Sequence, residues 1–325
     1  MKRFTDILCV ITKPELSKST LNRAVTLAEN NQAKLTVIAV ARHVSVGMGI
    51  PDGGPISADL QAAAVSACEQ QLEQAVAAFL PRVKIKTMVL VGVPFIEIIR
   101  EVLRNRHDLV VKACESMEWL NQRFGSEDMH LLRKCPCPVW LIKPSAPRTY
   151  RRVLAAVDVN DACPQDETES RQLLNQQIIE LAASMAIADF AELNIVHAWE
   201  ALGESEMRGS FMRVPEEKVN AYVEQARLQH ESSMEKLMRK VANDLDQGAL
   251  EYLNPEVLLV KGWARKVIPA LAKRIEADLV VMGTVARTGI PGFIMGNTAE
   301  SILSQLECSV LAIKPAAFAT PVKVY

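Results

Sequence analysis

Apolar residues in this chain gather in short runs that do not alternate with polar residues. The run ADLVVMG at 277–283 is an example, and such a run is typical of a parallel strand covered on both faces. Between the runs lie amphipathic segments such as IEIIREVLRNR at 96–106, with apolar positions at helical spacing. Regular alternation of strand and helix predicts an α/β fold with a doubly wound parallel sheet. The predicted strands are residues 6–12, 34–41, 84–91, 108–113, 138–143, 152–158, 192–199, 255–260, 278–283 and 309–314.

The second half of the chain repeats the pattern of the first. The segment HDLVVKA at 107–113 returns as ADLVVMG at 277–283, and CPVWLIKPS at 137–145 returns as CSVLAIKPA at 308–316. The first two strands of each half also match in the same order. Several matches in one order indicate two tandem copies of one domain, each a doubly wound, five-stranded, Rossmann-like parallel sheet.

The two copies meet at PSAPRTYRR, residues 144–152, a short linker that carries prolines. We expect the first domain at residues 1–146 and the second at 150–316. The last predicted strand of each copy, PVWLIKP and SVLAIKP, would be an unpaired apolar edge, and pairing removes such an edge. The copies are therefore expected to form a pseudo-dimer within one chain through these strands, and a further homodimer stays open.

Candidate binding residues follow strands of the second copy, at the strand ends where open α/β sheets bind ligands. Asp158 ends the first strand of this copy, and a glycine-bearing loop from Gly283 to Thr298 follows the fourth. The loop leads into the helix GNTAESILSQL, where Asn297 or Thr298 can cap. Glycines let the backbone approach a ligand, and the N–H groups of a helix start favour an anion. The arrangement would suit a nucleotide; an ordinary strand-to-helix turn and a turn aspartate are the alternatives.

The doubled pattern, with AAVD, LNIVHA, DLVVMG, the glycine loop and the closing CSVLAIKP, resembles the universal stress protein family over nearly the whole chain. Nucleotide-binding members carry glycine, two residues, glycine, nine residues, glycine, then serine or threonine. This chain keeps the spacing, but Ala286 replaces the second glycine and Asn297 replaces the hydroxyl residue. The resemblance implies a stress-response role and two universal stress protein domains. It also implies a ligand site in the second domain, formed by Asp158, Gly283, Val285, Ala286, Arg287, Gly296, Asn297, Thr298 and Ala299.

The two departures from the motif change the expected ligand. The methyl group of Ala286 intrudes where a phosphate passes close to the backbone, and Asn297 donates from an amide instead of a hydroxyl. We therefore expect weaker binding of ATP or AMP, or a different phosphate-bearing ligand. Apolar residues around the loop favour, as an alternative, a ligand that is partly apolar or carries an acyl chain. These residues are Ile290, Phe293, Ile294 and Met295.

The first copy departs further from the motif. Thr12 stands where the strand-end aspartate belongs, and Ala113 stands where the first glycine belongs. Its loop carries Glu115 and Glu118, which would repel a phosphate. Only Gly125 and Ser126 survive from the motif. We therefore interpret the first copy as a structural partner that has lost the site.

Other residues give no convincing catalytic or metal site. The segment CPCP at 135–138 lies near His130 but has no second pair of ligands, and Cys137 aligns with Cys308 where a small buried residue fits. We therefore expect structural cysteines. His197 and Asp158 could nominally join a serine triad, but no G-x-S-x-G segment and no Walker A lysine occur. An enzyme, such as a nucleotide hydrolase or transferase, would need a general base, and Asp158 is the candidate.

Composition narrows the remaining functions. The chain has 37 basic and 38 acidic residues, and a net charge of −1 gives no attraction to nucleic acid. No apolar stretch of about 18 residues occurs, so no membrane span is expected. The first residues lack the features of a signal peptide, and seven scattered cysteines suit a reducing cytosol. The expected protein is cytoplasmic and non-enzymatic, with a small-molecule ligand of unknown identity, no certain cofactor and no metal. A nucleotide hydrolase or transferase and a ligand-free scaffold are the alternatives.

Overall fold

The computed structural model describes residues 4–12, 14–44, 55–115, 125–160, 165–209, 214–244, 247–285 and 295–324. Strands and helices alternate through both halves, as predicted. The first copy comprises β1 (Asp6–Ile11), α1 (Pro14–Asn31), β2 (Lys34–Ala41), α2 (Pro55–Ala77), β3 (Ile85–Val91), α3 (Pro94–Asn105), β4 (Leu109–Ala113), α4 (Ser126–Lys134) and β5 (Val139–Ile142). The second comprises β6 (Arg152–Val157), α5 (Gln165–Asp189), β7 (Glu192–Trp199), α6 (Glu204–Arg208), α7 (Glu216–Asp244), α8 (Gln247–Leu253), β8 (Glu256–Lys261), α9 (Ala264–Arg274), β9 (Leu279–Gly283), α10 (Asn297–Leu303) and β10 (Ser309–Ile313).

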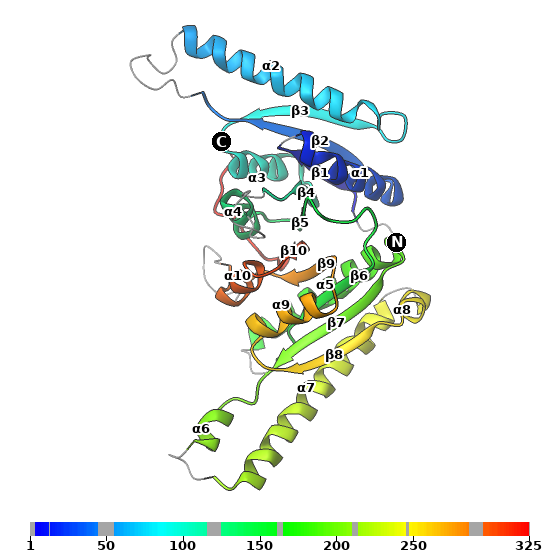
Figure 1. Ribbon diagram of the computed structural model, residues 1–325, viewed down its shortest axis with the longest axis vertical. Coiled ribbons are helices and arrows are strands. Elements are labelled where there is room, and N and C mark those ends of the chain that lie inside the picture. The colour runs from blue at the N-terminus through cyan, green and yellow to red at the C-terminus, as the bar shows by residue number, and fades with distance from the viewer. Residues whose placement is uncertain are drawn as a thin grey trace.

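All of these strands join one continuous sheet along the long axis of the molecule (Figure 1). Its order is β3-β2-β1-β4-β5-β10-β9-β6-β7-β8, and neighbouring strands within each copy are parallel. The copies meet where β5 and β10 pair antiparallel, with Leu311 opposite Trp140. The predicted pseudo-dimer through the last strands is therefore confirmed, because each last strand covers the edge of the other.

Two apolar clusters, one on each face of the sheet, explain why the strands show no alternation. Ile7 and Cys9 of β1 face the cluster formed with α1, α2, α5 and α7. Leu8 and Val10 face the other cluster, formed with α3, α4, α9 and α10. Both clusters run through both copies. The inner strands are thus buried on both faces, as expected for a parallel sheet covered by helices, while the edge strands β3 and β8 are more exposed.

The glycine and aspartate that recur in both copies have structural roles. Gly92 and Gly262 follow β3 and β8 with φ of 147° and 133°, a conformation that favours glycine. The Asp108 carboxylate accepts hydrogen bonds from the Thr5 N–H at 2.7 Å and the Asp6 N–H at 3.1 Å. The equivalent Asp278 accepts from the backbone at the start of β6. The repeated pair therefore ends one strand and fixes the start of another in each copy.

Polar contacts also hold the linker between the copies. The buried Arg23 of α1 reaches the second copy, where its guanidinium lies 3.1 Å from the Asp189 carboxylate. It also donates to the Pro147 carbonyl at 2.7 Å and lies 3.6 Å from the ring centre of Tyr150. At the far end of the chain, the Lys323 carbonyl accepts from Arg100 of α3 at 3.2 Å. The C-terminal tail thus returns to the first copy (Figure 1).

The second copy has extra helices between its second and third strands. Apolar residues at helical spacing predict one long helix over roughly residues 215–247, and α7 confirms it from Glu216 to Asp244. The short α8 then follows from Gln247 to Leu253. The helix α7 extends well beyond the sheet (Figure 1). Among the described helices, none combines the length and apolar character needed to cross a membrane.

Candidate functional site

A pocket of about 610 Å³ opens at the carboxyl ends of β6, β7 and β9 in the second copy. This is the end of the sheet where the sequence placed the candidate site. Six of the predicted residues line the pocket, namely Asp158, Gly283, Val285, Gly296, Thr298 and Ala299. Asn297 is exposed and does not line it. Ala286 and Arg287 lie outside the described residues.

Asp158 lies at the edge of the pocket with 62% of its side chain exposed. Its carboxylate accepts a hydrogen bond from the Asn160 N–H at 3.1 Å and lies 3.5 Å from the Arg171 guanidinium. The Asn175 side chain holds the Asp158 backbone through contacts of 2.7 and 3.0 Å. Asp158 is therefore a turn aspartate, as in the alternative interpretation of the sequence, and it also contributes a carboxylate to the pocket.

The two stems of the glycine loop are held together at the pocket wall. Val285 and Met295 form an antiparallel bridge, and the Gly296 N–H donates to the Thr284 carbonyl at 3.1 Å. Met295 is only 1% exposed, so the expectation that it offers apolar surface to a ligand is wrong. It packs in the core because the bridge turns it inward. The loop residues Ile290, Phe293 and Ile294 lie outside the described residues.

Gly283 also contributes to helix packing, whatever the pocket binds. A Cβ atom added there would come within 2.9 Å of the Leu174 side chain, which belongs to α5. The absence of a side chain lets α5 pack closely on β9. The first-copy equivalent, Ala113, is buried at 1% exposure.

The helix after the loop begins differently from the prediction. Gly296 is the N-cap residue of α10, and it offers no side-chain cap. The prediction that Asn297 or Thr298 caps this helix is wrong, because both already lie in its first turn. Thr298 and the buried Ala299 line the pocket from that turn, where backbone N–H groups have no partner within the helix.

Aromatic residues form a second wall of the pocket, which the sequence did not reveal. Trp199, Tyr222 and Trp263 line it from β7, α7 and the start of α9. The Trp263 side chain is 47% exposed, and the Arg265 guanidinium lies 4.3 Å from its ring centre. The Tyr222 hydroxyl donates to the Leu202 carbonyl at 2.8 Å. The pocket therefore combines a polar side near the glycine loop with an aromatic side.

A pair of histidines also faces this pocket. His197 Nε2 lies 3.0 Å from Nδ1 of His230, and its own Nδ1 lies 3.2 Å from the Val157 carbonyl. His197 is 2% exposed, and His230 packs on the Trp199 ring with the ring centres 5.7 Å apart. The sequence singled out His197 but not His230. A polar residue within the apolar run LNIVHA was the available signal, but its partner lies on a distant helix.

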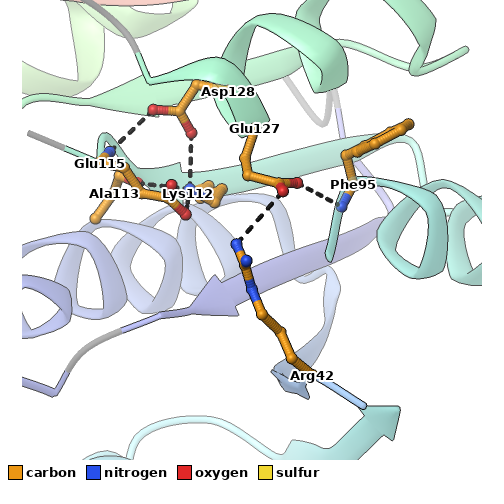
Figure 2. A network of polar contacts seen from close by, with 7 residues as sticks. All are labelled: Arg42, Phe95, Lys112, Ala113, Glu115, Glu127 and Asp128. Carbon is orange, nitrogen blue, oxygen red and sulfur yellow. Dashed lines mark hydrogen bonds and ion pairs between the residues drawn. The ribbon is translucent and has the colours of Figure 1, made fainter. Parts of the chain in front are cut away.

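The equivalent position in the first copy is filled by an internal ion pair (Figure 2). Lys112 of β4 is 1% exposed, and its Nζ lies 2.7 Å from the fully buried Asp128 carboxylate. Glu115 adds a contact to Lys112 at 3.2 Å, and its N–H donates to Asp128 at 2.9 Å. Burial opposes the charge of Lys112, but the two carboxylates outweigh it and raise its pKa.

A second acidic side chain of α4 occupies the neighbouring space. The Glu127 carboxylate accepts from the Phe95 N–H at the start of α3 and lies 3.4 Å from the Arg42 guanidinium (Figure 2). Glu127 and Asp128 both belong to the first turn of α4, so the protein's own carboxylates occupy the end of the helix that attracts anions. The predicted acidic character of this copy thus has a structural basis, while Glu118 lies outside the described residues.

The described side chains show no metal cluster. Across the described ranges, no group of three or more His, Cys, Asp and Glu residues is placed to hold a metal ion. His130 instead stacks on Phe95, with ring centres 4.8 Å apart. Cys135 and Cys137 lie together in the core, with their sulfur atoms 3.6 Å apart.

Comparisons with known proteins agree with this architecture. Universal stress protein E of Escherichia coli strain K12 is 34% identical over 232 residues, which cover 71% of this chain and 68% of the relative. A universal stress protein E homolog of Haemophilus influenzae is 31% identical over 326 residues, which cover 96% of this chain and 98% of the relative. A crystal structure of a candidate universal stress protein from Pseudomonas aeruginosa aligns with a TM-score of 0.68 at 24% identity. The alignment covers 97% of this chain and 95% of that protein.

A more distant structure shares the fold. A universal stress protein from Archaeoglobus fulgidus aligns with a TM-score of 0.62 at 17% identity, over 94% of this chain and 98% of that protein. The sequence profile of the universal stress protein family matches twice along this chain, at residues 3–143 and 149–314. The two matches correspond to the two halves of the ten-stranded sheet. This chain therefore belongs to the universal stress protein family.

Proposed function

We propose that the protein is a non-enzymatic stress-response protein of the cytoplasm whose second domain binds a small phosphate-bearing ligand. The stress role rests on family membership. The binding role rests on one observation, the pocket of about 610 Å³ on which the strand-end aspartate, the loop stems and the first turn of α10 converge. A nucleotide such as ATP or AMP is the first candidate, because it joins an anionic group to a flat ring.

The shape of the pocket supports a ligand of mixed character. Its polar side would receive the phosphate near Gly296 and Thr298, and Asp158 would accept hydrogen bonds from hydroxyl groups. Its aromatic side, with Trp199 and Trp263, would receive a base or another apolar part. A partly apolar, phosphate-bearing ligand is therefore the alternative occupant of the same pocket.

The first domain is proposed to bind no nucleotide. Its Asp128 carboxylate lies where a bound anion would otherwise lie, and Lys112 already neutralises it. An added phosphate would have to displace a buried ion pair, which costs several kcal/mol. We therefore expect one ligand per chain.

The test transfers the first domain's carboxylate into the second. Ala299 is the equivalent of Asp128 and lines the pocket, so Ala299→Asp should weaken ATP binding about tenfold or more through repulsion of the phosphates. Asparagine has nearly the same size as aspartate but no charge, so Ala299→Asn serves as the matched control. Calorimetry on the full chain measures affinity and stoichiometry. Equal affinities of the two variants, or two ATP molecules per chain, would contradict the proposed site.

A second set of variants tests the glycine loop. Ala286→Gly with Asn297→Ser restores the family motif and should strengthen ATP binding, while Gly296→Val should abolish it by blocking the approach of the backbone. If restoration gains nothing and Gly296→Val binds as the unaltered protein does, the loop is only a turn. Mass spectrometry of any small molecule that copurifies identifies the occupant directly.

The second candidate function is nucleotide hydrolysis in the same pocket. The histidine pair favours it, because His197 and His230 lie 3.0 Å apart at the pocket wall and imidazole is a common general base. Steady release of phosphate from ATP that is lost in both Asp158→Ala and His230→Gln would establish this alternative. Turnover that survives both substitutions would point to a contaminant.

A further inference from the structure

Cys135 and Cys137 form a close thiol pair at the junction of the two domains. Cys135 ends α4, where its N–H donates to the Leu131 carbonyl, and Cys137 lies just before β5. Their sulfur atoms are 3.6 Å apart, which is contact distance. Cys135 is fully buried and Cys137 is 9% exposed. Both thiols are therefore buried, and Cys137 is the less deeply buried residue of the pair.

A buried lysine from the other domain lies beside this pair. Lys314 follows β10 and is 5% exposed. Its ammonium donates to the Leu132 carbonyl in α4 and, at 3.0 Å, to the Thr284 hydroxyl at the pocket wall. Burial lowers the pKa of Lys314 to about 8, although the two thiols favour its charged form. The lysine is thus a cation held next to two sulfur atoms.

The environment of Cys135 differs from that of the other buried thiols. Burial raises the pKa of Cys9 to about 12 and also raises the pKa of Cys114. Burial acts the same way on Cys135, but hydrogen bonds from Cys137 and the Lys314 charge outweigh it and lower its pKa. The hydrogen bond to Cys135 and burial raise the pKa of Cys137, so Cys135 is the sulfur of the pair that more readily becomes a thiolate.

The second domain provides an internal comparison. Cys308 is the equivalent of Cys137, and Leu306 stands where the first domain has Cys135. Burial raises the pKa of Cys308 to about 12. The two copies therefore differ at this position, and the difference gives the first domain a second thiol next to Cys137.

We propose that Cys135 and Cys137 are an oxidation site, at which hydrogen peroxide converts the thiol pair into a reversible intramolecular disulfide. The thiolate of the pair attacks one oxygen of peroxide; the O–O bond breaks and, with one proton, water leaves and a sulfenic acid remains. The second thiol then attacks the sulfenic sulfur, and an S–S bond forms. Its proton joins the hydroxyl group, which leaves as the second water. Two thiols are oxidised and one peroxide is reduced to two waters.

The structure indicates which sulfur reacts first. Hydrogen peroxide is close to water in size, and Cys137, in contact with Cys135, is the less deeply buried residue of the pair. Because the pKa of Cys135 is the lowered one, its thiolate attacks the peroxide, and Cys137 then resolves the sulfenic acid from 3.6 Å away. Lys314 stabilises the thiolate before the reaction and is a positioning residue in this scheme.

Peptide mass spectrometry of the full native chain tests the proposal. The tryptic peptide 135–148 carries both thiols and no other cysteine. After brief peroxide treatment we expect this peptide to lose two hydrogen atoms and to regain them with dithiothreitol. Cys137→Ser and Cys135→Ser should instead gain oxygen without that loss, while the Cys308 peptide stays reduced. The proposal would be overturned if the peptide lost two hydrogen atoms only after the chain is unfolded in urea. It would also be overturned if either serine variant still lost them.

The role of Lys314 is tested by the rate of disulfide formation. One pKa unit changes the thiolate fraction about tenfold, so Lys314→Met should slow the reaction by about that factor. Lys143→Met, at the equivalent position of the first domain, is the matched control and should leave the rate unchanged. Equal rates for the two variants would contradict activation by Lys314. The mass change of the unaltered chain remains the test of the disulfide itself, should either variant fail to fold.

Discussion

The buried ion pair between Lys112 and Asp128 allows a quantitative prediction for the first domain. Both side chains are at most 1% exposed and their charged atoms lie 2.7 Å apart. At an effective dielectric constant of about 20, such a pair attracts by about 6 kcal/mol. Asp128→Ala removes one partner and leaves a buried ammonium whose remaining carboxylate is Glu115, at 3.2 Å. We expect a loss of about 3 kcal/mol of unfolding free energy, at the lower end of the range for broken buried pairs.

The second domain supplies the compensating variant. It has Met282 and Ala299 at the positions of Lys112 and Asp128, and both are buried. The double variant Lys112→Met with Asp128→Ala places the same uncharged residues in the first domain. Replacing a buried ion pair by packed apolar residues is often neutral or stabilising. We therefore expect the double variant to lie within about 2 kcal/mol of the unaltered protein, allowing about 1 kcal/mol for the lost acceptor of the Glu115 N–H.

Urea denaturation followed by circular dichroism measures these differences. A loss of about 3 kcal/mol should shift the midpoint by about 1 M. Because a chain with two domains need not unfold in one step, hydrogen exchange of peptides from β4 and α4 should locate the loss in the first domain. Asp128→Asn keeps the size and an acceptor oxygen without the charge, and should also destabilise. If the double variant is as unstable as Asp128→Ala alone, the buried charge is not the cause.

Two further predictions concern the junction between the domains. The folded pKa of Lys314, about 8, lies below its ordinary value of 10.5, so the unfolded state binds more protons between these values and stability should rise with pH there. Lys314→Met removes this titration, so urea titrations should show the unaltered protein gaining about 3 kcal/mol relative to the variant from about pH 7 to pH 10.5. A constant difference between the two proteins would contradict the lowered pKa. Halves expressed separately should dimerise or aggregate, because β5 and β10 would each become an unpaired edge, and sedimentation that finds two stable monomers would contradict this.

Much of the fold could be predicted from local pattern. The apolar runs located the strands to within a residue or two, because the inner strands are buried on both faces and so leave a continuous apolar signature. Gly92 and Asp108 recur as Gly262 and Asp278, because the positive φ favours glycine and the strand-start N–H groups are bound by a carboxylate. The helix start was misplaced at Asn297, since the side chain does not reveal that Gly296 already has the N-cap conformation.

The site could be predicted only in part. The rule that ligands bind at strand ends placed Asp158 and the glycine loop at one pocket, and the pocket lies there. The aromatic wall was missed because Tyr222 and His230 belong to α7, whose orientation over the sheet has no local signature. Met295 was misjudged for a related reason, because a single bridge to Val285 turns it into the core.

The sequence by itself determined the two copies, the order of their elements, the family and the end of the sheet where the pocket lies. Periodicity and repetition carry this information, because they report which residues are buried and in what order. Only the tertiary structure decided that Asp128 meets Lys112 in the interior of the first domain, and that Lys314 acts on Cys135 and Cys137 across the domain junction. Such contacts join side chains from separate elements, and their distance depends on how helices pack on the sheet, which no local pattern encodes.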